Sequence, residues 1–228
     1  MKPGLLWFCQ RAYVDGQYEI CRDMCLGFET LDDELELILT DCCLGLAIEY
    51  ALQGKLHRAC RLLDEAWTHS EATAYNTNLQ KNRIKICFAF LCELSPTLDS
   101  YEVDTYDLDR ISDPNYYVNA FDKYAILIFN IDGGYHIDEP LSGEDFSEVD
   151  KLLIDHLYAR SLISCKEFDK AKRILISIID GPVTPPRLLL YLTCCDMEIC
   201  CREINDYKGA YEFANNKLEI LEHMLAEE

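Results

Sequence analysis

A short pattern, a turn followed by an amphipathic helix, recurs four times in the sequence. The stretches are GQYEICRDMCLGF (16–28), QGKLHRACRLLDEA (53–66), CKEFDKAKRILISIID (165–180) and NDYKGAYEFANNKL (205–218). Aligned on the turn, they share an aromatic residue or leucine at one position, namely Tyr18, Leu56, Phe168 and Tyr207. One helical hairpin cannot bury its apolar face alone. The recurrence therefore predicts hairpins that stack on one another and share a core.

Small residues recur at two further positions of the pattern. Three residues after the shared aromatic or leucine stand Cys21, Ala59, Ala171 and Ala210, and nine residues before it stand Cys9, Ala47, Ala159 and the exception, Glu198. Small side chains let the two helices of a hairpin approach closely. Cysteine also serves as a small apolar residue, so we interpret most of the 13 cysteines as packing residues in a reducing compartment.

The spacing of the pattern is 38 residues from Tyr18 to Leu56 and 39 from Phe168 to Tyr207. Two-helix repeats of this length are typical of α-solenoids. The stretches GKLHRACRLLDEA, KEFDKAKRILISII and NDYKGAYEFANNKLEI resemble the second helix of tetratricopeptide repeats, although Glu198, Phe28 and Lys217 depart from the family pattern. The resemblance implies an all-α, right-handed solenoid of about five antiparallel hairpins in a single domain, 1–228, with clear repeats over 1–69 and 150–228.

The middle of the chain, 76–149, does not follow the pattern, and we expect a distorted repeat there. Two acidic stretches rich in Pro, Gly and Ser, 95–114 and 132–150, predict loop insertions. Between them, the apolar stretch 115–131 predicts a buried helix, with a strand as the alternative, and 76–94 is its expected partner helix.

The net charge of −20 disfavours nucleic acid and anionic lipid as partners. Lys81, Arg83 and Lys85 alternate in the sequence, so on a helix they spread over different faces and form no binding stripe. The sequence has no apolar span of about 20 residues, which crossing a membrane would need. We expect a cytoplasmic protein that binds neither nucleic acid nor membranes.

The tetratricopeptide resemblance implies a partner-binding groove, because the first helix of each repeat lines the inner surface in that family. The matching positions here are Trp7, Gln10, Tyr13, Asp41, Leu44, Ile48, Leu52, His156, Arg160, Cys195, Asp196, Ile199 and Arg202. A mixed apolar and acidic groove suits a basic or amphipathic peptide of a partner protein. The alternative is that several of these residues only pack against neighbouring repeats.

The acidic insertions are a second candidate surface. Tyrosines interleave with carboxylates there, and we name as candidates Tyr101, Asp104, Tyr106, Asp107, Asp109, Asp138 and Glu139. Aromatic anchors beside carboxylates could dock a basic partner. The alternative is a solvated, self-repelling loop, and neither stretch has the ligand order of a calcium loop.

No catalytic or metal-binding motif is found among the five histidines and 13 cysteines. We interpret His136, which neighbours Asp138 and Glu139, as a surface residue, and we predict no enzyme activity, no cofactor and no metal. The main functional prediction is a non-catalytic scaffold that binds a protein or peptide.

Three alternatives remain open. The first is a ligand- or peptide-responsive bacterial regulator that passes a shape change to an output partner. The second is an enzyme or metal protein built around the cysteines and His136. The third concerns assembly: the strip Leu218, Leu221, Met224 and Leu225 on the last predicted helix could form a homodimer, or could simply pack within the chain.

Overall fold

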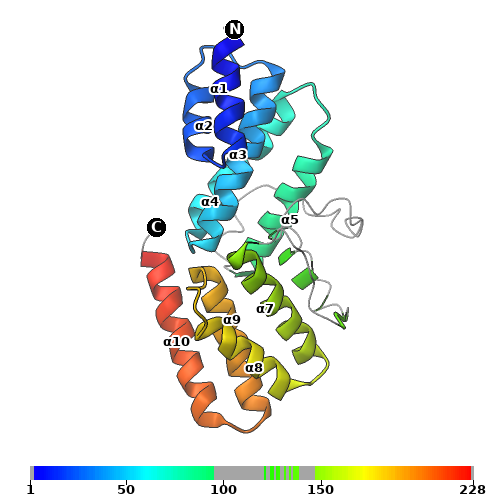
Figure 1. The fold of residues 1–228 in the computed structure, drawn as a ribbon, viewed down its shortest axis with the longest axis vertical. Helices are drawn as coiled ribbons and strands as arrows, with labels where there is room; N and C mark the ends of the chain where they lie inside the picture. The colour runs from blue at the N-terminus through cyan, green and yellow to red at the C-terminus, as the bar shows by residue number, and fades with distance from the viewer. Residues whose placement is uncertain are drawn as a thin grey trace. The chain divides into compact units, whose positions relative to one another are not determined.

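The computed structural model describes residues 3–94, 121, 124–125, 127–128, 131, 134, 136–138 and 147–226 (Figure 1). All regular structure in these residues is helical, which confirms the predicted all-α class for them. The helices are α1 (Pro3–Val14), α2 (Tyr18–Leu26), α3 (Asp33–Leu52), α4 (Leu56–Ala72), α5 (Asn78–Leu94), α7 (Glu148–Ser164), α8 (Phe168–Ile179), α9 (Arg187–Glu203) and α10 (Tyr207–Ala226). None of these helices is long and apolar enough to cross a membrane.

The predicted alignment of the four repeated stretches is confirmed at the level of helix starts. Helices α2, α4, α8 and α10 begin at the four aligned residues, Tyr18, Leu56, Phe168 and Tyr207. In each case the residue two positions earlier has a left-handed backbone, with φ of 72° at Gly16, 82° at Gly54, 62° at Lys166 and 63° at Asn205. The four turns therefore share one backbone conformation, although only two of them have glycine at that position.

Hydrogen bonds at three of these turns explain the shared conformation. The backbone N–H of Gln17 donates to Ala12 O at 2.9 Å, that of Glu167 to Leu162 O at 2.8 Å, and that of Asp206 to Cys201 O at 2.8 Å. In each turn, the left-handed residue folds the chain back so that the next N–H reaches a carbonyl in the last turn of the helix. This bond uses a carbonyl that the helix end would otherwise leave without a partner.

The predicted small positions are buried in three of the four hairpins. Cys9, Cys21, Ala47, Ala59, Ala159 and Ala171 all lie in the core. In the last hairpin the equivalent residues, Glu198 and Ala210, are only partly buried. The hairpin with the poorest sequence match is thus also the one whose aligned small positions are least buried.

The chain divides into two compact units. The first unit comprises Met1–Ala51 and Leu56–Tyr116, and the second comprises Leu52–Lys55 and Tyr117–Glu228. The expectation of one repeat domain over 1–228 stays a prediction.

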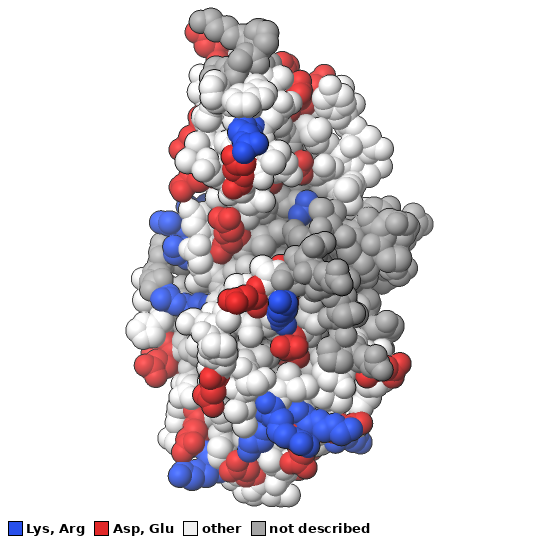
Figure 2. All heavy atoms as spheres, in the orientation of Figure 1, with Lys and Arg blue, Asp and Glu red and all other residues white. Residues whose placement is uncertain are grey.

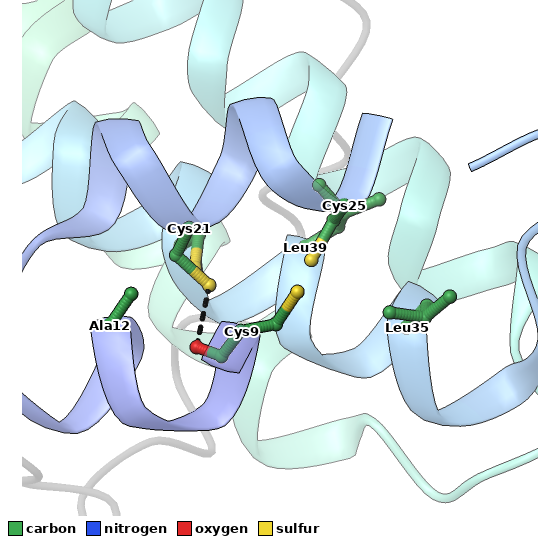
Figure 3. Close-up of a cluster of buried hydrophobic side chains, with 7 residues drawn as sticks. Cys9, Ala12, Cys21, Cys25, Leu35 and Leu39 are labelled. Carbon is green, nitrogen blue, oxygen red and sulfur yellow. Dashed lines mark hydrogen bonds between the residues drawn. The ribbon is translucent and has the colours of Figure 1, made fainter. Parts of the chain in front are cut away.

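In the first unit, α1 packs against α2 and α4 against α5. One core cluster joins α1, α2 and α3 through the buried residues Cys9, Ala12, Cys21, Cys25, Leu35, Leu39 and Cys42. Figure 3 shows the side chains of Cys9, Cys21 and Cys25 directed into this cluster, with the Cys21 thiol donating to the Cys9 carbonyl oxygen at 3.1 Å. Cysteine here fills space between close helices, as predicted from the sequence.

In the second unit, α7 packs against α8 and α9, α8 against α9, and α9 against α10 (Figure 1). Helix α7 begins with a capping box, in which the Ser147 side chain accepts from the Asp150 N–H and the Asp150 side chain accepts from the Ser147 N–H. The described residues of 121–131 are helical and buried, which favours the predicted helix over a strand at those positions.

Candidate functional site

Two predicted groove residues of the first unit, Tyr13 and Asp41, lie near one another on different helices. Tyr13 on α1 lies close enough to Asp41 on α3 for that carboxylate to contribute, after burial, to raising the pKa of Tyr13 to about 12. The Gln80 side chain on α5 and the positive charge of Arg83 both act to lower the pKa of Asp41. Polar side chains of α1 and α5 therefore lie near Asp41 on α3.

Burial dominates the electrostatics around Asp41. Burial raises the pKa of Asp41, while the positive charge of Arg83 and the Gln80 side chain lower it. Asp41 is only partly buried by surface area, so its carboxylate sits at the boundary between core and solvent. A carboxylate in such a place interacts strongly with a cation that displaces the remaining water.

An aromatic pair adjoins these residues. The rings of Tyr13 and Tyr18 have centroids 5.9 Å apart. Gly45 on α3 makes room for Tyr18, because a Cβ atom at Gly45 would lie 2.8 Å from the Tyr18 ring. The first residue of α2 can therefore pack directly on the backbone of α3, with its ring against that of Tyr13.

The remaining groove candidates of this unit differ in accessibility. Trp7 is 56% exposed, and its ring meets that of Phe8 edge to face with centroids 5.1 Å apart. Gln10 is exposed and donates a hydrogen bond to Glu34 at 2.8 Å. Ile48 is partly buried. Trp7, Gln10 and Tyr13 are three residues apart in turn, so each is rotated by about 60° from the one before, and Trp7 and Tyr13 are separated by about 120° around α1.

In the second unit, three predicted groove residues form a buried polar network instead. His156 on α7 and Asp196 on α9 are both 0% exposed, and His156 Nε2 lies 3.3 Å from Asp196 Oδ2. Arg160 donates to the other Asp196 oxygen at 2.9 Å, and the Tyr124 hydroxyl is 2.9 Å from His156 Nδ1. Burial lowers the pKa of His156 to about 3, with the Arg160 charge adding to this effect, so the ring is neutral at physiological pH.

This network limits which residues could meet a partner. His156 and Asp196 join α7 to α9 from the inside and present no surface. The Arg160 side chain is 23% exposed, and that of Arg202 is 56% exposed and lies 3.9 Å from Glu198. Among the predicted groove residues of the second unit, Arg202 is exposed, and Arg160, Cys195 and Ile199 are partly buried.

A second polar network, between α2, α3 and α4, was not identified from the sequence. Arg22 donates two hydrogen bonds to Glu65, at 2.9 and 2.8 Å, and His69 Nδ1 lies 2.6 Å from Glu36 Oε2. Glu65 and Glu36 raise the pKa of His69, while the bonds from His69 and Arg22 lower the pKa of Glu65 to about 2. The spacing of Glu65 and His69 by four residues was the local signal for it.

Most of the predicted acidic-loop surface lies outside the described residues, namely Tyr101, Asp104, Tyr106, Asp107, Asp109 and Glu139. Asp138 is described, and its side chain is 91% exposed with Oδ1 3.3 Å from His136 Nε2. No group of three or more His, Cys, Asp or Glu side chains in the described ranges is arranged to hold a metal ion.

The strip predicted on the last helix is not a single exposed face. Leu218 is exposed, Leu221 is partly buried and Met224 is 2% exposed, while the side chain of Leu225 is not among those described. The large apolar or aromatic side chains that α10 does expose are Tyr207, Tyr211 and Leu218.

No protein-family model, curated protein or solved structure matches the chain. The likeness to tetratricopeptide repeats therefore rests on the aligned residues themselves.

Proposed function

We propose that the chain is a non-catalytic helical-repeat scaffold of the tetratricopeptide type, which binds a basic or amphipathic peptide segment of a partner protein. The observation that supports this most is the meeting of Tyr13, Asp41 and Gln80 on α1, α3 and α5. In a solenoid of such hairpins, the first helices form the inner surface. Side chains from three successive first helices around one partly buried carboxylate would suit that surface.

The chemistry of this face favours a cationic ligand with an apolar side. Trp7 is an exposed aromatic residue of the kind that anchors peptides at interfaces. Asp41 supplies a partly desolvated negative charge on the neighbouring helix. An amphipathic helix or extended segment could place an apolar side chain on Trp7 and a lysine or arginine near Asp41.

The net charge of the chain also favours a basic partner. With a formal charge of −20, long-range attraction would speed the encounter with a basic segment and repel acidic ones. Such steering is screened by salt, whereas contacts with Trp7 and with a partly buried carboxylate are screened much less. Salt dependence therefore separates general attraction from specific binding.

The proposal is tested with synthetic helical peptides. Fluorescence anisotropy would measure the binding of three labelled amphipathic peptides of about 20 residues, which share one apolar face and carry net charges of about +5, 0 and −5. We expect the cationic peptide to bind, and we expect Trp7→Ala and Asp41→Asn each to weaken its binding by about tenfold. About 0.5 M salt should reduce the affinity without abolishing it.

Tyr75→Ala is the matched control, because Tyr75 is an aromatic residue of similar exposure, 54%, in the connection between α4 and α5. Its affinity for the peptide should equal that of the unchanged chain. If all three variants bind the cationic peptide equally, or if high salt removes all binding, the binding depends only on the net charge of the chain and the proposed site is wrong.

A capture experiment would then identify the natural partner. The purified chain and its Trp7→Ala variant serve as paired baits in the native lysate, at low salt and at about 0.5 M salt. A protein retained by the unchanged chain at both salt concentrations, and lost with the variant, is the expected partner. If both baits retain the same proteins, the α1 face is not the binding surface.

A further inference from the structure

Cys165 differs from every other cysteine of the chain in its exposure. All 13 cysteines are described and are present as thiols; ten are buried, Cys92 and Cys195 are partly buried, and Cys165 is exposed. It caps the C-terminal end of α7 at the turn that leads into α8. Its thiol is the most accessible to reagents in solution.

A histidine lies in contact with this thiol. His136 Nδ1 is 3.1 Å from Cys165 Sγ, within hydrogen-bonding reach for sulfur. The other ring nitrogen, Nε2, lies 3.3 Å from Asp138 Oδ1. A nucleophile beside a base, with the base oriented in turn by a third group, is the arrangement that activates cysteine in covalent chemistry. Asp138 is well exposed, so its orienting effect is weak compared with the contact between His136 and the thiol.

The packing of the neighbouring residue explains why His136 lies there. Ile137 is buried, and its backbone N–H donates to Ser161 Oγ on α7 at 2.7 Å. Ser161 and Cys165 are four residues apart, so they lie on the same side of α7. Ser161 Oγ is also 2.8 Å from His136 Nδ1. The chain around Ile137 is therefore fastened to α7 at Ser161, and His136 reaches Cys165 one turn further along.

The charges around the pair have opposing effects on a thiolate. The C-terminal end of a helix carries a partial negative charge, which repels a negative charge that develops on the Cys165 sulfur. Positive charges have the opposite effect, and Lys166, Lys170 and Arg173 are exposed in the turn after Cys165 and in the first half of α8. Lys170 also pairs with Glu167. Figure 2 shows basic side chains gathered in the lower part of the face that it draws, where Figure 1 draws α8.

We propose that Cys165 is a nucleophilic thiol, activated by His136, and that this pair is a site of covalent modification by small disulfides. His136 Nδ1 takes the proton from Sγ. The Cys165 thiolate then attacks one sulfur of the disulfide R–S–S–R, so that a Cys165–S–S–R bond forms and the original S–S bond breaks. The leaving RS⁻ takes the proton from His136 and departs as RSH. No further oxidant or reductant is needed.

The test is the kinetics of the intact chain with 4,4′-dithiodipyridine, a neutral aromatic disulfide whose reduced product is followed by absorbance. One equivalent should react in a fast phase, about tenfold faster near pH 7 than the cysteine of a short unstructured peptide. Mass spectrometry of the modified chain should locate the adduct on Cys165. Cys165→Ser should remove the fast phase and leave only the slow reaction of the remaining thiols.

The role of His136 is read from the pH dependence of the rate. In the unchanged chain the fast phase should persist below pH 7. In His136→Gln the helix end opposes the thiolate without a base to compensate, so the rate near pH 7 should fall by at least about tenfold, to below that of the peptide thiol. Asp138→Asn should slow it by only about twofold to threefold. His223→Gln, which changes an exposed histidine on α10, is the matched control and should react as the unchanged chain does.

Three results would each overturn the proposal. The fast phase could survive in Cys165→Ser, which would place the reactive thiol elsewhere. His136→Gln could react with the same rate and pH profile as the unchanged chain, in which case the histidine is a neighbour and not a base. All 13 thiols could also react more slowly than the peptide thiol. Circular dichroism of each variant would verify that the helices are retained.

Discussion

At the scale of single residues, the two helices of each hairpin cross over a small side chain. Ala59 and Ala171 have 0% exposure at this position, while Ala210 occupies the same place in the last hairpin and is only partly buried. An added side chain must therefore push the helices apart in the first two cases, but can turn toward solvent in the third.

This difference gives a matched set of substitutions. Ala59→Leu and Ala171→Leu should each lower the free energy of unfolding by about 1–3 kcal/mol through overpacking. Ala210→Leu should change it by less than about 0.5 kcal/mol. Urea denaturation followed by circular dichroism measures all three. Equal effects at the three positions would mean that the helix crossings do not share one register.

These residues could be predicted from the sequence because a buried helix crossing favours a small residue, and a small residue recurs at this position in each repeated stretch. Sequence reasoning also explained most cysteines correctly as packing residues. It could not find that His136 contacts Cys165, because this contact joins residues 29 positions apart through a non-repeated segment. The tetratricopeptide resemblance also placed His156 and Asp196 among the groove candidates, since matching a family position gives the face of a helix but not the depth of burial.

At the scale of helices and turns, all four hairpins use a left-handed residue two positions before the second helix. Glycine adopts this backbone without strain, whereas for residues with a Cβ atom the left-handed conformation costs roughly 1–2 kcal/mol of free energy. Asparagine tolerates the conformation better than lysine does. Gly16 has no atom within 4 Å of a would-be Cβ, so the effect of a side chain there is a backbone effect alone.

The turns therefore predict opposite results for opposite substitutions. Gly16→Ala should lower the free energy of unfolding by about 1 kcal/mol, and Lys166→Gly should raise it by about 0.5–1 kcal/mol. Asn205→Gly should give a smaller gain than Lys166→Gly. Thermal and urea unfolding would measure the series. A loss of stability on Lys166→Gly would show that the lysine side chain contributes more than its backbone strain costs.

The starts of the second helices could be predicted because the 38- and 39-residue spacings align them. The conformation of Lys166 and Asn205 could not, because neither residue type demands a left-handed backbone. In the middle of the chain the repeat is lost, and only the helical state of the described residues in 121–131 could be anticipated there, from their apolar character.

At the scale of the whole molecule, the two units contain histidines whose pKa values are shifted in opposite directions. His69 in the first unit is held above its ordinary value by Glu65 and Glu36, and His156 in the second unit is lowered to about 3 by burial. A raised pKa gives stability that is complete below about pH 6.5 and is lost as the pH rises through the folded-state value. A lowered pKa gives stability that is complete above about pH 6.5 and is lost as the pH falls toward about 3.

Acidification from above the folded-state pKa of His69 to about pH 6.5 should therefore stabilise the first unit, and acidification below about pH 6.5 should destabilise the second unit. Between about pH 6.5 and about pH 4.5, the second unit should lose roughly 1 kcal/mol of stability for each pH unit, while the charge pairs of the first unit are retained. Glu65 keeps its charge over this range, because its pKa is about 2. Hydrogen exchange with mass spectrometry, corrected for the intrinsic pH effect, would compare α7 and α9 with α3 and α4.

Two variants make this prediction specific. His156→Gln should remove the acid sensitivity of α7 and α9, even though it lowers their stability at neutral pH, and His69→Gln should remove the gain in α3 and α4. If acid reduces protection in both units alike, or if His156→Gln leaves the slope unchanged, the two histidines do not govern the response.

The concentration of thiols in the interior has a consequence for what happens after the chain unfolds. Ten cysteines are sheltered only for as long as the helices remain packed. Once the chain opens in the presence of oxygen or disulfides, these thiols can pair at random, and a wrongly paired chain cannot restack its hairpins. The persistence of the native protein then depends on how seldom it opens, so its useful lifetime under oxidising conditions is set by a rate and not by an equilibrium.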